Sequence, residues 1–556
     1  MNRPSTLDTR NAQRFPTLNR SEIARLVRFG QMRSFAGGEY LSRTGEIGLG
    51  MFVIISGHVA VTQHDGPMGR GPIVTHGPGA FTGELAQLSG RPSLVDSQAK
   101  DPVQALILPP QQLRNVLVEE ADLGELIMRA LILRRVVLLQ EGIGGPVIVG
   151  RAVNGDVLRL EGFLSSNSHP YQRLDPDTDQ AARAIIERFS LTPEQLPIVL
   201  CPSGQFLRNP SESELGRCLG MVRSIDETRV YDVAIVGAGP AGLAAAVYAG
   251  SEGLATIVLE CRSFGGQAGA SARIENYLGF PTGISGRALM ARANSQAQKF
   301  GVEMAIPDQA TNLHRPGPDQ PFVIDLVNKE RVKARTVVIA TGARYRRLAV
   351  ENLAAFEGTS VHYWASPLEA RLCSGEEVAL VGAGNSAGQA AVYLAAQVTR
   401  VWLLARGRSL EASMSRYLIE RIRAQSNIEL AFETEVCALE GEAGALQAII
   451  CRDRSGVATR LAVRHLFVFI GAEPNTDWLS ASGLALDAKG FVHTGAQAAA
   501  AKMPLQTNLS GVFAIGDVRC DSTKRVAAAV GEGAQVIASI HGYLARAGLE
   551  PGSNEP

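Results

Sequence analysis

A glycine-rich turn between an apolar strand and an alanine-rich helix constrains the fold of this chain more than any other feature. The segment YDVAIVGAGPAGLAAAVYA places Gly237, Gly239 and Gly242 in a GxGxxG spacing. The first glycine permits a tight turn, the second lets the backbone approach a pyrophosphate, and the third lets the helix pack on the strand. The positive end of the helix then faces the phosphates. The next apolar segment, ATIVLE, ends at Glu260, where an acid is placed to accept hydrogen bonds from a ribose 2′-hydroxyl.

The same strand, turn and helix pattern recurs at VALVGAGNSAG, with Gly382, Gly384 and Gly388. It predicts a second dinucleotide-binding unit in the same region. The strand RVWLLAR follows, and no acid ends it; Arg406 and Arg408 stand there instead. Two arginines suit a 2′-phosphate and favour NADPH over NADH. The alternative is that both arginines are simply solvated after an edge strand.

Length and composition place these two units in a larger, neutral protein. The 556 residues correspond to three or four domains at roughly 150 residues each. Hydrophobic residues make up 46% and charged residues 19%, which predicts a sizeable buried core. Because 54 basic residues balance 54 acidic ones, no global field favours nucleic acid or an anionic membrane as a partner.

The sequence carries no signal for export or membrane insertion. The segment MNRPSTLDTRNAQRFP lacks the apolar core of a signal peptide, and the longest run of small apolar residues, 234–250, is interrupted by glycines and shorter than the roughly 18 residues of a membrane span. None of the seven cysteines lies in a CxxC spacing, and they are too scattered for a disulfide scaffold, which fits a reducing compartment. We therefore expect a cytoplasmic protein, and nothing predicts a metal site.

Further motifs follow the two glycine turns in order. VVIATGA, with Thr341 and Gly342, has the pattern of a strand running into a tight turn where the chain crosses between domains. GAEPNT (471–476), within FIGAEPNT, has the pattern of the return crossover. GVFAIGD ends at Asp517, placed to bond a ribityl hydroxyl. The helix that begins near Arg525 and Val526 would direct its first amides at the N1/C2=O edge of a flavin, where they would stabilise negative charge on the reduced ring.

Together with SFGGQ and IENYLGFP, these motifs resemble the two-domain flavoprotein reductases, and most closely the low-molecular-weight thioredoxin reductases, over about residues 229–544. The resemblance implies FAD in a split domain (230–345 and 473–545), an inserted NADPH domain (346–472), and a homodimer formed through the FAD domains. The residues expected to contact the two cofactors are Gly237, Ala238, Gly239, Pro240, Ala241, Gly242, Glu260, Gly266, Gln267, Asn276, Thr341, Gly342, Gly382, Gly384, Asn385, Ser386, Ala387, Arg406, Arg408, Asp517, Arg525 and Val526.

The chain departs from this family where the redox dithiol belongs. In thioredoxin reductases a CxxC just before the second glycine motif takes electrons from the flavin. Aligned from Phe356, those positions fall on Trp364 and Pro367, and neither can exchange thiols. Cys373 is nearby but lone, so we expect it to be a buried small apolar residue. Trp364 either stacks near the flavin and shields it or is an ordinary packing residue.

The preceding segment, about 145–222, resembles a glutaredoxin- or thioredoxin-like domain that has also lost its thiols. FLSSNSHPYQRLD followed by LPIVL places His169-Pro-Tyr-Gln172 where that family has CPYC, and Pro197 where it has a cis-proline. Cys201 and Cys218 do not restore the spacing. His169 could titrate near neutrality, but we expect a surface histidine. The resemblance implies a docking or scaffolding module for a protein partner.

The N-terminal segment, 1–140, resembles a cyclic-nucleotide-binding β-roll, through FVIISGHVAV and the cassette FTGELAQLSGRPSLV. In that family the cassette's Gly-Glu, here Gly83 and Glu84, binds ribose, and an arginine nine residues after the glutamate grips the cyclic phosphate. That position is Ser93, and Arg91 lies two residues early. Without the bidentate guanidinium contact nucleotide affinity should fall heavily, unless a loop shift lets Arg91 substitute. The alternative is a packing domain that has kept its fold.

Three functions remain open on the sequence. The first is an NADPH-dependent FAD oxidoreductase that passes electrons to a quinone, a ferredoxin-like protein, oxygen or a small molecule; a cysteine-free relative of this architecture is ferredoxin–NADP reductase. The second is reduction of thioredoxin disulfide, which needs a dithiol that the sequence does not supply. The third is a signalling flavoprotein with weak turnover that senses redox and nucleotide state. The expected fold is therefore a β-roll, a thioredoxin-like α/β unit and a Rossmann-like flavoprotein with two dinucleotide-binding domains.

Overall fold

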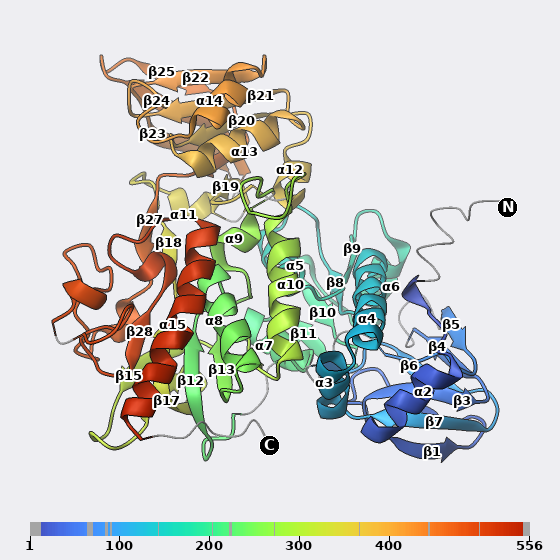
Figure 1. The fold of residues 1–556 in the computed structure, drawn as a ribbon. Helices are drawn as coiled ribbons and strands as arrows, with labels where there is room; N and C mark the ends of the chain where they lie inside the picture. The colour runs from blue at the N-terminus through green and yellow to red at the C-terminus, as the bar shows by residue number, and fades with distance from the viewer. Residues whose placement is uncertain are drawn as a thin grey trace.

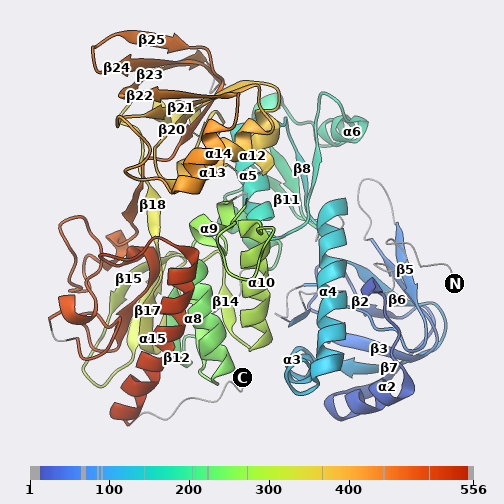
Figure 2. The same ribbon diagram turned by 45° about the horizontal axis from the view of Figure 1, so that its top comes forward.

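A computed structural model describes residues 13–63, 71–83, 87–88, 92–142, 144–202, 204–221, 225–271, 273–357, 359–365, 367–442, 445–499 and 501–548. Figures 1 and 2 show four parts that follow one another from the N-terminus: an antiparallel β-roll, a small α/β unit, and two larger sheets with their helices. Among the helices within those ranges, none has the length and apolar character needed to cross a membrane.

The β-roll is made of two antiparallel sheets, with strand orders β1-β7-β3 and β2-β6-β4-β5. Its core is apolar, with Met51, Val53 and Leu106 fully buried. The apolar stretch 123–140 lies inside α4, and Gly142 follows this helix in the left-handed conformation that favours glycine (φ 65°). Its elements are α2 (Arg20–Leu26), η1 (Val27–Phe29), β1 (Gln31–Phe35), β2 (Tyr40–Ser42), β3 (Met51–Ser56), β4 (Val59–Thr62), β5 (Pro72–His76), β6 (Asp96–Ala99), β7 (Val103–Leu108), α3 (Pro110–Glu119) and α4 (Ala121–Glu141).

The next part, which we call the middle unit, is a four-stranded sheet of order β11-β10-β8-β9. β8 and β9 are parallel, whereas β10 is antiparallel to both β8 and β11. The Leu196–Pro197 peptide before β10 is cis. Its elements are β8 (Val147–Val149), α5 (Gly155–Ser166), β9 (Gln172–Leu174), α6 (Gln180–Arg188), η3 (Pro193–Gln195), β10 (Ile198–Leu200), β11 (Phe206–Arg208) and α7 (Glu212–Cys218).

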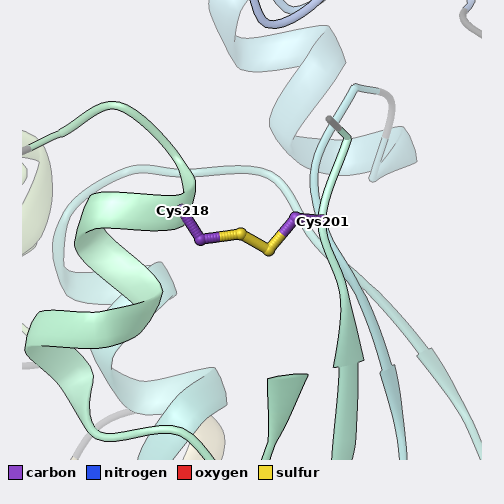
Figure 3. The surroundings of a disulfide bond; sticks show 2 residues. All are labelled: Cys201 and Cys218. Atoms are coloured by element: carbon purple, nitrogen blue, oxygen red, sulfur yellow. A yellow bond between two sulfur atoms is a disulfide. The ribbon is translucent and has the colours of Figure 1, made fainter. Parts of the chain in front are cut away.

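The middle unit contains a disulfide that the sequence did not predict, and the expected exposure of its histidine is wrong. Cys201, at the end of β10, and Cys218, at the end of α7, form a disulfide with their Cα atoms 6.4 Å apart, as Figure 3 shows. The spacing of 17 residues gave no hint of this pair, because it arises only when α7 folds back along the sheet. His169 is buried rather than on the surface, with 4% of its area exposed and Nδ1 2.9 Å from the carbonyl oxygen of Pro170.

The first nucleotide unit, as we call the sheet that carries Gly237–Gly242 and its helices, has the strand order β14-β13-β12-β17-β16-β15, with β28 also paired to β17. α8 packs so closely on α15 that a Cβ on Gly533 would lie 2.6 Å from that of Ala244. The small side chains of the alanine-rich α8 permit this approach. Its elements are β12 (Val230–Val236), α8 (Pro240–Ser251), β13 (Thr256–Leu259), α9 (Gly266–Ala270), α10 (Gly286–Lys299), β14 (Glu303–Ala305), β15 (Ala310–His314), β16 (Phe322–Leu326), β17 (Arg331–Ile339), η4 (Asp477–Leu479), η5 (Gly495–Gln497), β28 (Val512–Ala514), η6 (Gly516–Val518) and α15 (Val526–Arg546).

The second nucleotide unit is a parallel sheet of order β19-β26-β20-β21-β22, flanked by an antiparallel β23-β24-β25 sheet. A two-stranded antiparallel ribbon, β18 paired with β27, carries the chain between the two nucleotide units. The elements are β18 (Ala343–Tyr345), α11 (Leu353–Phe356), β19 (Val361–His362), α12 (Pro367–Leu372), β20 (Glu377–Val381), α13 (Asn385–Ala395), β21 (Arg400–Ala405), α14 (Arg416–Arg423), β22 (Ile428–Phe432), β23 (Thr434–Glu442), β24 (Ala445–Asp453), β25 (Ala458–Leu461), β26 (His465–Val468) and β27 (Ala472–Pro474).

The middle unit lies between the β-roll and the first nucleotide unit in Figure 1. On the β-roll side, Arg135 of α4 donates to the carbonyl oxygen of Ser168 at 2.8 Å. On the other side, Asn167 Nδ2 donates to the carbonyl oxygen of Arg262 at 3.0 Å, and the Arg262 guanidinium pairs with Glu212 at 2.9 Å. These contacts make the middle unit the bridge between the β-roll and the first nucleotide unit.

The Cys201–Cys218 pair leads to a direct prediction. Of the seven cysteines, two are paired and five are free, so protein denatured without reductant should take up five maleimide groups by intact-mass spectrometry, and seven after reduction. A Cys201→Ser/Cys218→Ser variant should take up five in both conditions and lose about 3 kcal/mol of stability for a loop of this length. Uptake of seven groups before reduction would contradict the pairing.

Candidate functional site

The main candidate site is a cavity of about 590 Å³ between the two nucleotide units. Residues from both glycine motifs, from the β18–β27 ribbon and from the start of α15 form its wall. The sequence-predicted residues that line it are Gly239, Pro240, Ala241, Glu260, Gly266, Gln267, Asn276, Thr341, Gly342, Asn385, Ser386, Asp517, Arg525 and Val526.

The first glycine motif is a turn that only glycine permits at two of its three positions. Gly237 has φ 112°, and a Cβ there would lie 2.2 Å from the carbonyl oxygen of Ala340. A Cβ on Gly242 would lie 1.9 Å from the carbonyl oxygen of Gly237. Gly239 is different, because a Cβ there would meet no protein atom within 4 Å. The turn is therefore packed against backbone on one side and open toward the cavity at Gly239. Gly237, Ala238 and Gly242 belong to the same turn but do not line the cavity.

Glu260 follows β13 and lies on the cavity wall beside this turn. Its Oε2 accepts a hydrogen bond from the backbone N–H of Ala238 at 2.9 Å, and its Oε1 accepts from the N–H of Arg262 at 3.3 Å. Both bonds fix the carboxylate at the mouth of the glycine turn. Burial raises the pKa of the adjacent Cys261 thiol to about 12, and the Glu260 carboxylate adds to this shift, so the thiol stays protonated at neutral pH.

Side chains tie the crossover ribbon to the cavity wall. Thr341 Oγ1 donates to the carbonyl oxygen of Asn475 at 2.9 Å, and Asn475 Nδ2 donates back to the carbonyl oxygen of Thr341 at 2.9 Å. Gln267 Nε2 donates to the carbonyl oxygen of Ala343. The chain therefore leaves and re-enters the first nucleotide unit at a single cross-linked point.

Asp517 and the start of α15 close one end of the cavity. Burial raises the pKa of the Asp517 carboxyl, although nearby Lys524 opposes this shift. Lys524 Nζ donates to the carbonyl oxygen of Asp517 at 2.6 Å. Arg525 caps the 21-residue helix α15, which begins at Val526, so the positive end of a long helix dipole lies at this wall.

The second glycine motif faces the same cavity from the other unit. Gly382 has φ 149°, and a Cβ there would lie 2.4 Å from the carbonyl oxygen of Phe469. Asn385 Oδ1 accepts from the backbone N–H of Ser415 at 2.7 Å and from its Oγ at 2.8 Å, which leaves Ser386 beside it on the cavity wall. Gly384 and Ala387 lie in the same turn but outside the lining.

The two predicted phosphate-binding arginines do not line the cavity. Arg406 and Arg408 are exposed in the turn after β21. Arg408 pairs with Glu433, with Nε 2.8 Å from Oε1. Arg454 pairs with the same oxygen at 3.0 Å, and both arginines hold the pKa of the Glu433 carboxyl below its usual range.

Trp364 lines the cavity, whereas Pro367 is exposed at the start of α12. Trp364 Nε1 donates to Glu369 Oε1 at 2.9 Å, which holds the indole at the wall. Cys373 is fully buried, and burial raises the pKa of its thiol. Across the described ranges, no group of three or more His, Cys, Asp or Glu side chains could hold a metal ion.

The sequence did not single out several lining residues from the second unit and its connectors, because they face the first unit only in the folded arrangement. Tyr345 stacks on Tyr363, with ring centroids 6.1 Å apart, and Arg421 of α14 pairs with Glu275 of the first unit. No local pattern marks such pairs. Missed residues of the second unit and its connectors include Tyr345, Gln389, Tyr393, Arg421 and Asn475, and Lys524 of the first unit was missed as well.

A second, smaller cavity of about 70 Å³ lies in the β-roll. Gly83 lines it, and so does Ser93, whose Oγ donates to the carbonyl oxygen of Val95 at 2.7 Å. Glu84 and Arg91, the other two residues predicted for nucleotide binding, lie outside the described residues.

Comparisons with known proteins match both regions. The family described as pyridine nucleotide-disulphide oxidoreductase matches residues 231–533, and the cyclic nucleotide-binding domain matches residues 32–120. The thioredoxin reductase of Mycolicibacterium smegmatis is 32% identical over 57% of this chain and 97% of its own length. An alkyl hydroperoxide reductase component from Xanthomonas campestris pv. phaseoli is 31% identical, over 57% of each chain. The crystal structure of Lactococcus lactis thioredoxin reductase (FR conformation) covers 57% of this chain and 99% of its own, with 27% identity and a TM-score of 0.52.

The contrast between Gly239 and Gly242 gives a matched pair of variants. Gly242→Ala should lower the free energy of unfolding by about 3 kcal/mol, because the new methyl group overlaps the Gly237 carbonyl. Gly239→Ala should change it by less than about 0.5 kcal/mol, since its φ of −75° suits alanine and its Cβ meets open space. Urea unfolding of both variants without added cofactor measures the difference. Equal destabilisation would mean that the turn is not packed in this way.

Proposed function

Because the chain belongs to the pyridine nucleotide-disulphide oxidoreductase family, we propose that it oxidises NADPH through bound FAD and passes the electrons to an acceptor without an enzyme dithiol. Membership makes it an FAD-dependent NAD(P)H oxidoreductase. The observation that carries the rest of the proposal is the shared cavity. Both glycine turns open onto it, and its wall carries Trp364, at the position aligned with a redox cysteine.

The residues of the first nucleotide unit suit FAD. Gly239 leaves space for a pyrophosphate, and Glu260 is fixed where a ribose hydroxyl could donate to it. Asp517 is placed for a ribityl hydroxyl, and the first amides of α15 for the flavin edge that becomes negative on reduction. Bound FAD supplies a ring that accepts a hydride and releases electrons one or two at a time.

The second nucleotide unit would hold NADPH at the turn before α13. Asn385 is anchored by Ser415, so Ser386 and the first amides of α13 are free to meet phosphate oxygens. The exposed turn after β21 would then carry the 2′-phosphate between Arg406 and Arg408. Arg408 would exchange its pair with Glu433 for a phosphate contact, which a guanidinium makes with two donors.

The proposed acceptor receives electrons directly from the flavin. No two cysteines of the chain lie in a CxxC spacing, and the one cysteine on the cavity wall, Cys261, is held protonated. Trp364 covers the wall where thiols would be needed. A quinone, a ferredoxin-like protein, oxygen or another small molecule would satisfy this chemistry. A quinone or oxygen would consume NADPH and one proton for each two-electron reduction, whereas two one-electron ferredoxin-like acceptors would consume NADPH and release one proton.

Reduction of thioredoxin disulfide is the second candidate, because relatives at 31–32% identity carry the name thioredoxin reductase. It requires a dithiol from outside the chain.

We also propose that the middle unit is a thioredoxin-like docking module, supported by its strand order and the placement of its helices, and that the chain forms a homodimer through the first nucleotide unit. A signalling role with weak turnover is the third candidate, and the β-roll favours it.

Anaerobic spectroscopy tests the proposed function. The purified protein should show a flavin spectrum that NADPH bleaches, and the bleached enzyme should reoxidise with a quinone or oxygen but not with thioredoxin disulfide. A flavin that NADPH does not reduce would refute the hydride route. Reduction of thioredoxin as the fastest acceptor would establish the second candidate, and slow turnover with every acceptor would favour the third.

The 2′-phosphate assignment predicts a change in nucleotide preference. Arg406→Ala/Arg408→Ala should raise KM for NADPH at least tenfold, since each lost guanidinium contact to phosphate costs about 1.5 kcal/mol or more, and should leave KM for NADH unchanged. Arg454→Ala is the matched control, because it breaks the other Glu433 ion pair without touching the proposed site. If wild-type protein uses NADH as well as NADPH, the assignment is wrong.

A further inference from the structure

The β-roll cavity contains a buried guanidinium that no carboxylate of the described residues neutralises. Arg134, on α4, is 7% exposed and lines the cavity. Its Nε donates to the carbonyl oxygen of Arg14 at 3.0 Å and its Nη1 to that of Gly83 at 2.9 Å. Nη2 is buried and has no hydrogen-bond partner. Within the described ranges, no acidic side chain forms a salt bridge with Arg134.

The groups around Arg134 hold its guanidinium in place without neutralising its charge. The guanidinium carbon lies 4.7 Å from the ring centre of Phe81 and 5.3 Å from that of Phe15, distances at which a ring attracts a cation. Burial lowers the pKa of Arg134 to about 9, which still leaves it charged at neutral pH. Burial and the charge of Arg134 lower the pKa of His76, on the same wall, to about 3, so the imidazole is neutral.

A buried charge without a partner destabilises the protein. A ligand that accepts a hydrogen bond from the free Nη2 of Arg134 would remove this cost. With Nε and Nη1 already engaged, Nη2 can serve one acid group from one side. The cavity holds a second unpartnered polar atom, the buried Oε1 of Gln87, which would accept from a hydroxyl or amine. Val61, Val74 and Val137 supply apolar wall. Glu141 also lines the cavity but is exposed, two helical turns beyond Arg134.

We propose that this cavity binds a compact organic monoanion, a carboxylate that also carries a hydrogen-bond donor, through Nη2 of Arg134 and Oε1 of Gln87. One carboxylate oxygen accepts from Nη2 of Arg134, the hydroxyl or amine of the ligand donates to Gln87, and the short apolar body of the ligand lies against the valines. The volume of about 70 Å³, a few water molecules' worth at roughly 10–15 Å³ each, suits such an acid rather than a cyclic nucleotide. Ser93, at the position aligned with the phosphate-gripping arginine, already gives its hydroxyl to Val95.

Calorimetry on the full-length flavoprotein tests this site with three matched probes. 2-Hydroxybutyrate should bind, butyrate should bind at least threefold more weakly because Gln87 stays unpaired, and 2-hydroxybutyramide should bind at least tenfold more weakly because it carries no charge. Inorganic phosphate and cAMP complete the set, and neither should bind more tightly than 2-hydroxybutyrate.

Variants separate the site from a general loss of structure. Arg134→Gln should abolish binding, but it also removes two contacts to backbone carbonyls. Val137→Phe fills the cavity without touching the guanidinium and should lose binding at least tenfold while the flavin spectrum and melting temperature are kept. Arg135→Gln, next along α4 but directed at Ser168, should bind as wild type does. Equal binding of acid and amide, tighter binding of cAMP or phosphate, or no heat with any probe at 10 mM would each overturn the proposal.

Discussion

The structure depends on the exchange of hydrogen bonds between Thr341 and Asn475, where the chain leaves the first nucleotide unit and returns to it. Each residue donates a side-chain hydrogen bond to the backbone carbonyl of the other, and β18 pairs with β27 immediately beyond. Two separate passages of the chain thus become one ribbon. The Arg421–Glu275 ion pair also joins the two units, and in this arrangement residues of both glycine motifs line a single cavity.

The sequence could predict the glycine turns because their chemistry is local. Gly237 and Gly382 need a positive φ and a close backbone contact, so the residue type itself records the geometry. Tyr345, Tyr393 and Arg421 reach the cavity only through the placement of one unit on another, which no spacing encodes. The Cys201–Cys218 pair and the burial of His169 were missed for the same reason. Arg406 and Arg408 follow β21 as the pattern predicts but remain outside the cavity.

The cysteines of this sequence lie in no CxxC spacing, which bears on the proposed reaction. A dithiol relay would have to contact the flavin and then an outside partner, which requires movement between two positions. Trp364 is held by Glu369 and does not need to move between two positions. The proposed acceptor, which would reach the flavin directly, does not need such a movement either. Arg421 pairing with Glu275 is compatible with a fixed arrangement. The interface between the two nucleotide units would then need to admit the acceptor and would not need to rearrange during the reaction.

Helix α4 joins the β-roll to the rest of the molecule through two adjacent arginines with opposite surroundings. Arg134 is directed into the β-roll cavity, while Arg135 donates to Ser168 of the middle unit. Successive residues on a helix differ in direction by about 100°, so these two neighbouring residues of α4 contact the β-roll on one side and the middle unit on the other. The next contact along this line, Asn167 to the carbonyl oxygen of Arg262, reaches the loop after Glu260. A change in the position of Arg134 therefore has a continuous packed path to the nucleotide cavity. A path alone does not establish energetic coupling, which requires that the two sites favour different positions of α4. Among the described residues no acid pairs with Arg134, so an anion bound in the β-roll would change the electrostatic balance on one side of α4 and leave the other side unchanged.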